Sequence, residues 1–159
     1  MADETYTVER SALMSAPPER IYELIADFHN WPQWSPWEGL DPDMRRTYSG
    51  ADSGTSAAYS WSGNRRAGQG RMEIRAASAP STVDIDLAFE KPFKSRSDTV
   101  FTIAPAGPEE SRVTWTMTGK KTLMTKVMGV FKSMDAMIGP DFEKGLAQLK
   151  SVVEHPASD

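Results

Sequence analysis

Alternation of apolar and polar residues dominates the middle of the chain. Between residues 44 and 119 this alternation comes in short runs separated by turn-forming residues, which is typical of β-strands with one buried face. Residues 82–90 show it most clearly, with four apolar side chains on one face and Asp84 and Asp86 on the other. We expect strands at residues 44–48, 55–62, 65–77, 82–90, 95–104 and 112–119.

A further strand is expected at residues 5–14, which are rich in β-forming residues but do not alternate simply, whereas residues 65–77 alternate strictly. In residues 5–14, Tyr6 and Val8 share one face while Leu13 has the opposite parity, so we expect a bulge near residues 10–11. In residues 65–77, strict alternation turns Met72, Ile74 and Ala76 inward.

Helical spacing follows the first expected strand. Ile21, Leu24, Ile25 and Phe28 recur at i, i+3, i+4 and i+7, which predicts an amphipathic helix ending near residue 29. Residues 31–37 then hold three tryptophans and two prolines. Proline at these positions prevents a long helix, so we expect a short helical turn or a rigid loop whose indoles fill a core or line a cavity.

The C-terminal stretch, residues 122–154, also has apolar residues in steps of three and four. Gly139 and Pro140 interrupt it, and proline disfavours helix at the residue before it. We therefore expect a methionine-rich segment at residues 123–137 and a separate helix from about residue 140 to 154, in which Phe142, Leu146 and Leu149 face the core.

The order of these elements predicts the fold. Consecutive strands joined by short turns form an antiparallel meander, whose apolar face needs a cover. The C-terminal helix is the long apolar element that could supply it. We therefore expect an α+β fold in which an antiparallel sheet of about seven strands curves around the C-terminal helix, with two short helices after the first strand.

Composition narrows the class of protein. A chain of 159 residues is expected to form a single domain, here residues 1–159, with a core at about residues 5–154 and a frayed tail at residues 155–159. The net charge of −4 argues against nucleic-acid binding. The absence of cysteine fits a cytoplasmic protein, two histidines make a multi-histidine metal site impossible, and no apolar run could span a bilayer.

Several segments together carry a resemblance to a known family. They are residues 16–19 (APPE), 27–37 (DFHNWPQWSPW), 59–64 (YSWSGN), 68–72 (GQGRM), 134–135 (MD) and 138–146 (IGPDFEKGL). With them the chain resembles the START/Bet v 1-like (SRPBCC) superfamily and, more narrowly, its bacterial polyketide cyclase/dehydrase-like proteins. The resemblance implies a helix-grip fold with a cavity between the sheet and the C-terminal helix. It implies no shared cofactor and no universal catalytic residue.

An apolar, aromatic-rich cavity is the first candidate site, since ligand sites are mostly apolar and methionine adapts to varied shapes. The alternative for each residue is that it simply fills the core. The candidate ligand-binding residues are Trp34, Trp37, Tyr59, Trp61, Met72, Ile74, Phe89, Trp115, Met117, Met124, Met128 and Phe131.

Acid–base chemistry is the second candidate. Asp27, His29 and Glu38 lie close to the tryptophan-rich segment, and a carboxylate beside an imidazole could move protons. The alternative, which we favour, is structural: His29 at a helix end and Asp27 hydrogen-bonded to the backbone.

Three functions remain open. The first is binding of a hydrophobic or aromatic small molecule, lipid- or polyketide-like, by a monomer or homodimer with no nucleic-acid or integral-membrane partner. The second is a polyketide cyclase, aromatase or dehydratase without metal or cofactor, for which buried ionisable groups in the cavity would be the distinguishing feature. The third is a protein-recruiting stress-response module, for which an exposed patch and no cavity would be expected.

Overall fold

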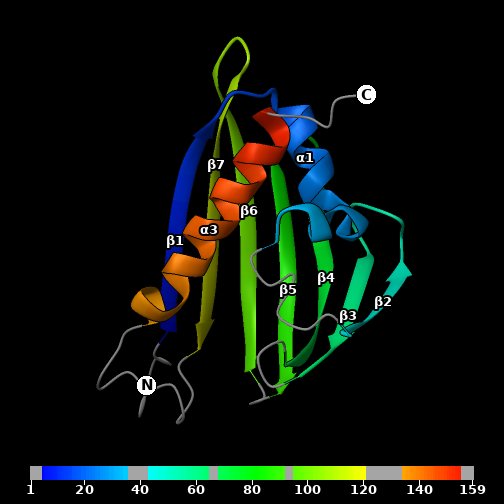
Figure 1. The fold of residues 1–159 in the computed structure, drawn as a ribbon. Coiled ribbons are helices and arrows are strands. Elements are labelled where there is room, and N and C mark those ends of the chain that lie inside the picture. The colour runs from blue at the N-terminus through cyan, green and yellow to red at the C-terminus, as the bar shows by residue number, and fades with distance from the viewer. Residues whose placement is uncertain (1–4, 36–42, 65–67, 92–94, 121–133, 155–159) are drawn as a thin grey trace.

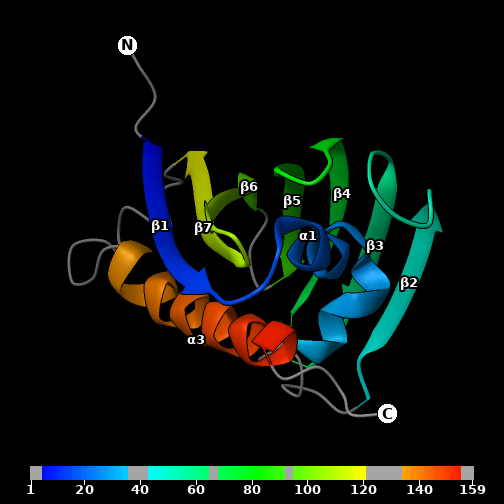
Figure 2. The same ribbon diagram turned by 90° about the horizontal axis from the view of Figure 1, so that it is seen from above.

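The computed structural model describes residues 5–35, 43–64, 68–91, 95–120 and 134–154. Figure 1 shows a strongly bent antiparallel sheet with helices on its inner side. Seen from above in Figure 2, the sheet forms an arc, and helices α1 and α3 lie across its open side. The helices therefore cover the concave face of the sheet and leave its convex face uncovered.

Seven strands form the sheet, and their order is β1-β7-β6-β5-β4-β3-β2. All neighbours are antiparallel, so β2 to β7 form a meander and β1 joins it beside β7. The strands are β1 (Thr5–Met14), β2 (Arg45–Gly50), β3 (Ala57–Ser62), β4 (Gln69–Ser78), β5 (Thr82–Lys91), β6 (Ser95–Gly107) and β7 (Glu110–Lys120). The predicted seven-stranded curved sheet is confirmed.

Three helical elements complete the described fold. Helix α1 (Pro18–Ala26) begins with proline in its first turn, where the missing amide proton costs no hydrogen bond. The 3-10 helix η1 (Phe28–Gln33) follows directly. Helix α3 (Met134–Glu154) buries Phe142, Leu146, Leu149 and Val153 against the sheet, as the helical spacing predicts. This arrangement is the helix-grip fold.

The bulge predicted in the first strand was wrong. Strand β1 pairs with β7 in one unbroken register, and the inward parity that begins at Tyr6 and Val8 ends at the fully buried Met14. Leu13 instead lies outside, where 38 % of it is exposed. A register shift occurs in β4 instead, between Ile74 and Ala76, and it leaves Ala76 exposed rather than inward.

The helix break predicted at Pro140 was also wrong, because α3 continues through it. Pro140 lies on the exposed side of the helix, where its ring needs no room in the core. The neighbouring Gly139 has a packing reason: a Cβ there would lie 2.1 Å from Nη2 of Arg10. The Arg10 guanidinium lies against the helix at this point, and its Nε lies 2.8 Å from Oε2 of Glu143.

Candidate functional site

An apolar pocket lies between the concave face of the sheet and the helical elements. Its volume is about 70 Å³. Strands β3, β4, β5, β6 and β7 contribute to its wall, together with η1 and α3. The lining residues are Phe28, Trp31, Pro32, Ser35, Met44, Tyr59, Trp61, Met72, Leu87, Phe89, Thr99, Trp115, Met117 and Phe142.

Strand alternation explains why these side chains meet. On β4, Met72 points inward while its neighbours Arg71 and Glu73 point outward, because successive side chains leave a strand on opposite faces. Gly70 lies on the same inward parity. A Cβ at this position would lie 2.5 Å from the Ala88 carbonyl oxygen and 2.8 Å from the Trp61 ring. Glycine here therefore gives the Trp61 ring its place in the wall.

Hydrogen bonds to the backbone of α1 hold the first two indoles of the tryptophan-rich segment in place. The Trp31 Nε1 donates to the Ile25 carbonyl and the Trp34 Nε1 donates to the Leu24 carbonyl, both at 2.9 Å. These bonds satisfy two orphan carbonyls in the last turns of α1. Gln148 on α3 donates to the Trp34 carbonyl at 2.6 Å. The segment is thereby fixed to α1 on one side and to α3 on the other.

The structure separates the predicted ligand-binding residues into three groups. Trp34 and Ile74 are fully buried outside the pocket wall, so they fill the core. Trp37, Met124, Met128 and Phe131 lie outside the described residues. The six that line the pocket are Tyr59, Trp61, Met72, Phe89, Trp115 and Met117.

Sequence reasoning missed the two polar residues of the wall, Ser35 and Thr99. Thr99 shares its parity on β6 with the buried residues Phe101 and Ile103, and this signal could have placed it inward. Ser97, two residues earlier, is also buried. Polar hydroxyls thus interrupt an otherwise apolar inner face.

The predicted acid–base residues lie elsewhere. Oδ1 of Asp27 accepts a hydrogen bond from the His29 backbone at 2.9 Å and lies 2.8 Å from its ring Nδ1, so Asp27 caps the start of η1. The His29 ring stacks on Tyr48, with centroids 4.1 Å apart. His29 borders a second, more polar pocket of about 140 Å³, which Asp52 also lines. Glu38 lies outside the described residues.

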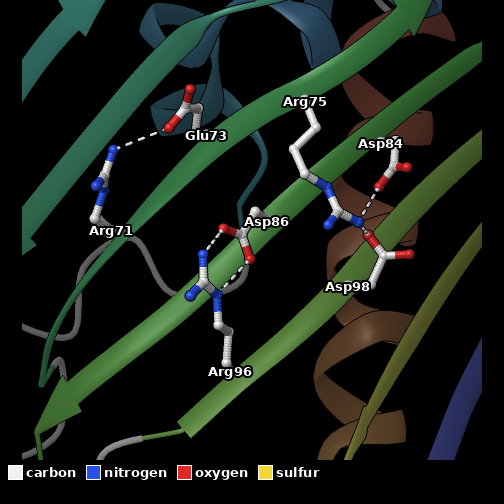
Figure 3. Close-up of polar contacts among 7 residues, drawn as sticks. All are labelled: Arg71, Glu73, Arg75, Asp84, Asp86, Arg96 and Asp98. Atoms are coloured by element: carbon white, nitrogen blue, oxygen red, sulfur yellow. Dashed lines mark hydrogen bonds and ion pairs between the residues drawn. The ribbon is translucent and has the colours of Figure 1, made fainter.

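Charged groups gather on the convex face instead (Figure 3), and the helices lie behind the strands in this view. Arg75 on β4 pairs with both Asp84 on β5 and Asp98 on β6, and Arg96 pairs with Asp86. Partial burial, followed by the neighbouring Asp84, raises the pKa of Asp98 to about 6. The hydrogen bonds and charge of Arg96 lower the pKa of Asp86. These pairs join three adjacent strands across the face that α1, η1 and α3 leave uncovered (Figure 2).

In the described ranges, no group of three or more histidine, aspartate or glutamate side chains is arranged to hold a metal ion. No helix in these ranges is both long enough and apolar enough to cross a bilayer.

The sequence matches the model of a protein family over most of its length. The family described as polyketide cyclase / dehydrase and lipid transport matches residues 5–154, which include every described strand and helix. No protein with a curated description matches the chain.

Solved structures share the fold at low sequence identity. A START superfamily protein from Mycobacterium smegmatis is 15 % identical with a TM-score of 0.67, over 95 % of this chain and 99 % of its own. Protein MLL2253 from Mesorhizobium loti is 20 % identical with a TM-score of 0.63, over 98 % of this chain and 100 % of its own. The Aha1 dimer from Colwellia psychrerythraea is 13 % identical with a TM-score of 0.63, over 96 % and 99 %. These likenesses concern the fold alone.

Proposed function

Because the chain belongs to the polyketide cyclase/dehydrase and lipid transport family, we propose that it binds a hydrophobic or aromatic small molecule between the sheet and α3. The observation that carries the proposal is the chemistry of the pocket wall. All but two of its side chains, Ser35 and Thr99, are apolar or aromatic, and none in the described part of the chain is charged. Such a wall favours an apolar ligand through burial of its surface.

The volume of the pocket bears on the size of the ligand. About 70 Å³ is well below the several hundred Å³ that drug-sized ligands occupy. A ligand of one or two rings therefore has to move side chains as it enters. Met72 and Met117 line the wall, and their unbranched, flexible side chains can yield at low cost. We accordingly propose a compact ligand rather than a whole bilayer lipid.

Binding is favoured over catalysis by the position of the ionisable groups. A cyclase or dehydratase needs a proton donor or acceptor within hydrogen-bond reach of its substrate. Asp27 and His29 are absent from the apolar wall, and Asp27 has a structural role as a cap. Among the described residues of the wall, Tyr59 alone carries an ionisable group, so the carboxylate–imidazole pair of an acid–base mechanism is missing there.

The cellular location is a separate part of the proposal. We propose the cytoplasm, and the lack of cysteine is compatible with that reducing compartment.

Titration with N-phenyl-1-naphthylamine, an uncharged apolar fluorophore, tests the proposal. We expect its emission to rise on saturable binding to the purified protein. Met72→Trp should weaken binding at least tenfold, because the larger side chain fills the pocket from β4. Glu73→Trp places the same side chain on the convex face and is the matched control, for which the Kd should not change. Equal binding to both variants, or none to the native protein, would refute the proposal.

A further inference from the structure

The apolar pocket contains a buried hydroxyl that has no hydrogen-bond partner among the described residues. This is the Thr99 side chain, which lines the wall and is 5 % exposed. Buried polar groups in folded proteins are nearly always hydrogen-bonded, and one without a partner needs a specific explanation. The Thr99 hydroxyl is therefore a feature that the packing of the fold does not account for.

The position of Thr99 explains why its neighbours cannot satisfy it. It lies at the centre of the concave face on β6, in register with Ile85 on β5 and with Met117 on β7. Both of these side chains are apolar and buried. The preceding inward residue on β6, Ser97, differs because it lies beside the Tyr6 hydroxyl: burial raises the pKa of Tyr6, and Ser97 opposes this increase. The fold thus places a polar neighbour next to one inward hydroxyl of β6 and leaves the next one facing the pocket.

A ligand group is the natural partner for such a hydroxyl. A threonine hydroxyl can both donate and accept a hydrogen bond, so a phenol, an alcohol or a ketone oxygen would satisfy it. Sites that hold a buried polar group discriminate against ligands that leave this group unpaired. A hydrocarbon of the same shape would leave the Thr99 hydroxyl without a partner.

We propose that the pocket selects neutral, oxygen-bearing hydrophobic molecules over pure hydrocarbons, and that Thr99 is the residue that recognises the oxygen. This inference rests on the proposed binding function and adds the class of ligand. The ligand is neutral because the wall offers no positive side chain in the described ranges. An ionised carboxylate buried without such a partner would bear the full cost of losing its hydration.

A cycle of two ligands and two proteins tests this role of Thr99. 2-Naphthol and 2-methylnaphthalene have nearly the same shape but differ in one hydroxyl, and Thr99→Val exchanges the corresponding group on the protein. We expect the native protein to bind 2-naphthol roughly threefold to tenfold more tightly than 2-methylnaphthalene, the size of one net hydrogen bond. In Thr99→Val this preference should disappear, mainly through weaker binding of 2-naphthol.

Two controls isolate the hydroxyl from other effects of the substitution. Thr114→Val makes the same exchange on the outward parity of β7 and should leave the preference unchanged. The unfolding temperature of ligand-free Thr99→Val should equal or exceed that of the native protein, because the substitution removes a buried hydroxyl that the described fold leaves unpaired.

A charged ligand tests the neutral ligand class. 2-Naphthoate, which carries a negative charge at neutral pH, should bind at least tenfold more weakly than 2-naphthol.

The outcomes separate the inference from the proposed function. If 2-methylnaphthalene binds but the preference for 2-naphthol is absent from the native protein or persists in Thr99→Val, the role of Thr99 is refuted and the binding function stands. Tighter binding of 2-naphthoate than of 2-naphthol would overturn the neutral ligand class. If neither neutral probe binds the native protein, the binding function fails and the inference fails with it.

Discussion

The indole of Trp115 on β7 stacks face to face on the ring of Phe142 on α3, with centroids 4.0 Å apart and planes inclined by 8°. Both side chains are almost fully buried, and both line the apolar pocket. This stacked pair joins the sheet to the helix that it grips. The same contact that stabilises the fold therefore forms part of the candidate binding site.

Phe142→Ala is expected to lower the free energy of unfolding by about 3–5 kcal/mol, because it removes a buried ring and leaves a cavity beside Trp115. Urea unfolding followed by circular dichroism measures this change. The exposed Lys144 lies two residues further along the same helix. Lys144→Ala should change the stability by no more than about 0.5 kcal/mol. A similar loss in both variants would contradict the assigned role of the stacked pair.

Gly70→Ala is expected to displace the Trp61 ring and to cost roughly 1–3 kcal/mol, since the new Cβ would meet both a carbonyl oxygen and the indole. The displacement should also change the intrinsic tryptophan emission. Gly54→Ala is a useful comparison, because its Cβ would touch nothing within 4 Å while its φ of +71° disfavours alanine. This variant should lose stability but leave the contribution of Trp61 to the emission unchanged.

Asp98 should make stability fall as the pH rises through about 6. Burial raises its pKa above 3.8, Asp84 adds to the increase, and Arg75 opposes it. Between about pH 4 and pH 6 the folded protein then holds a proton that the unfolded chain releases. This stabilisation is complete below about pH 4 and is lost as the pH passes through the folded pKa. The lowered pKa of Asp86 acts at lower pH and leaves this interval unaffected.

Urea midpoints at pH 5 and pH 7 measure the effect of Asp98. Asp98→Asn should show a smaller decrease between the two pH values than the native protein. Asp86→Asn, on the neighbouring strand β5, serves as the control and should keep the native decrease. An undiminished decrease in Asp98→Asn would show that another group is responsible.

Asp27 is expected to act as a helix cap. Asp27→Ala should destabilise the protein by about 0.5–2 kcal/mol, because it removes the acceptor for the His29 backbone. Asp27→Asn should lose much less, since asparagine caps helices about as well as aspartate. His29→Phe keeps a ring that can stack on Tyr48 and should be nearly neutral. Thermal unfolding compares the three variants, and equal losses for Ala and Asn would argue against the cap.

Much of the architecture follows from the sequence, because strand parity and helical period are local properties. Alternation on β5 alone identifies its inward side chains, and the spacing of Phe142, Leu146 and Leu149 identifies the face of α3 that packs on the sheet. Two local patterns led to wrong predictions. The parity of Leu13 predicted a bulge in β1, although Met14 is the buried residue at this end of the strand. Pro140 predicted a helix break, but α3 continues through it with the proline ring on the exposed side.

The binding site depends on information that local patterns lack. Met72 and Ile74 have the same parity on β4, yet the first lines the pocket and the second fills the core. Nothing in the alternation distinguishes them, because their depth depends on which distant elements pack over them. The surroundings of each inward hydroxyl are likewise a matter of long-range contacts. Ser97 lies beside Tyr6 on the far side of β7, whereas the Thr99 hydroxyl has no hydrogen-bond partner among the described residues and lines the pocket. The sequence by itself determined which faces are buried, and only the tertiary structure decided which buried groups remain available to a ligand.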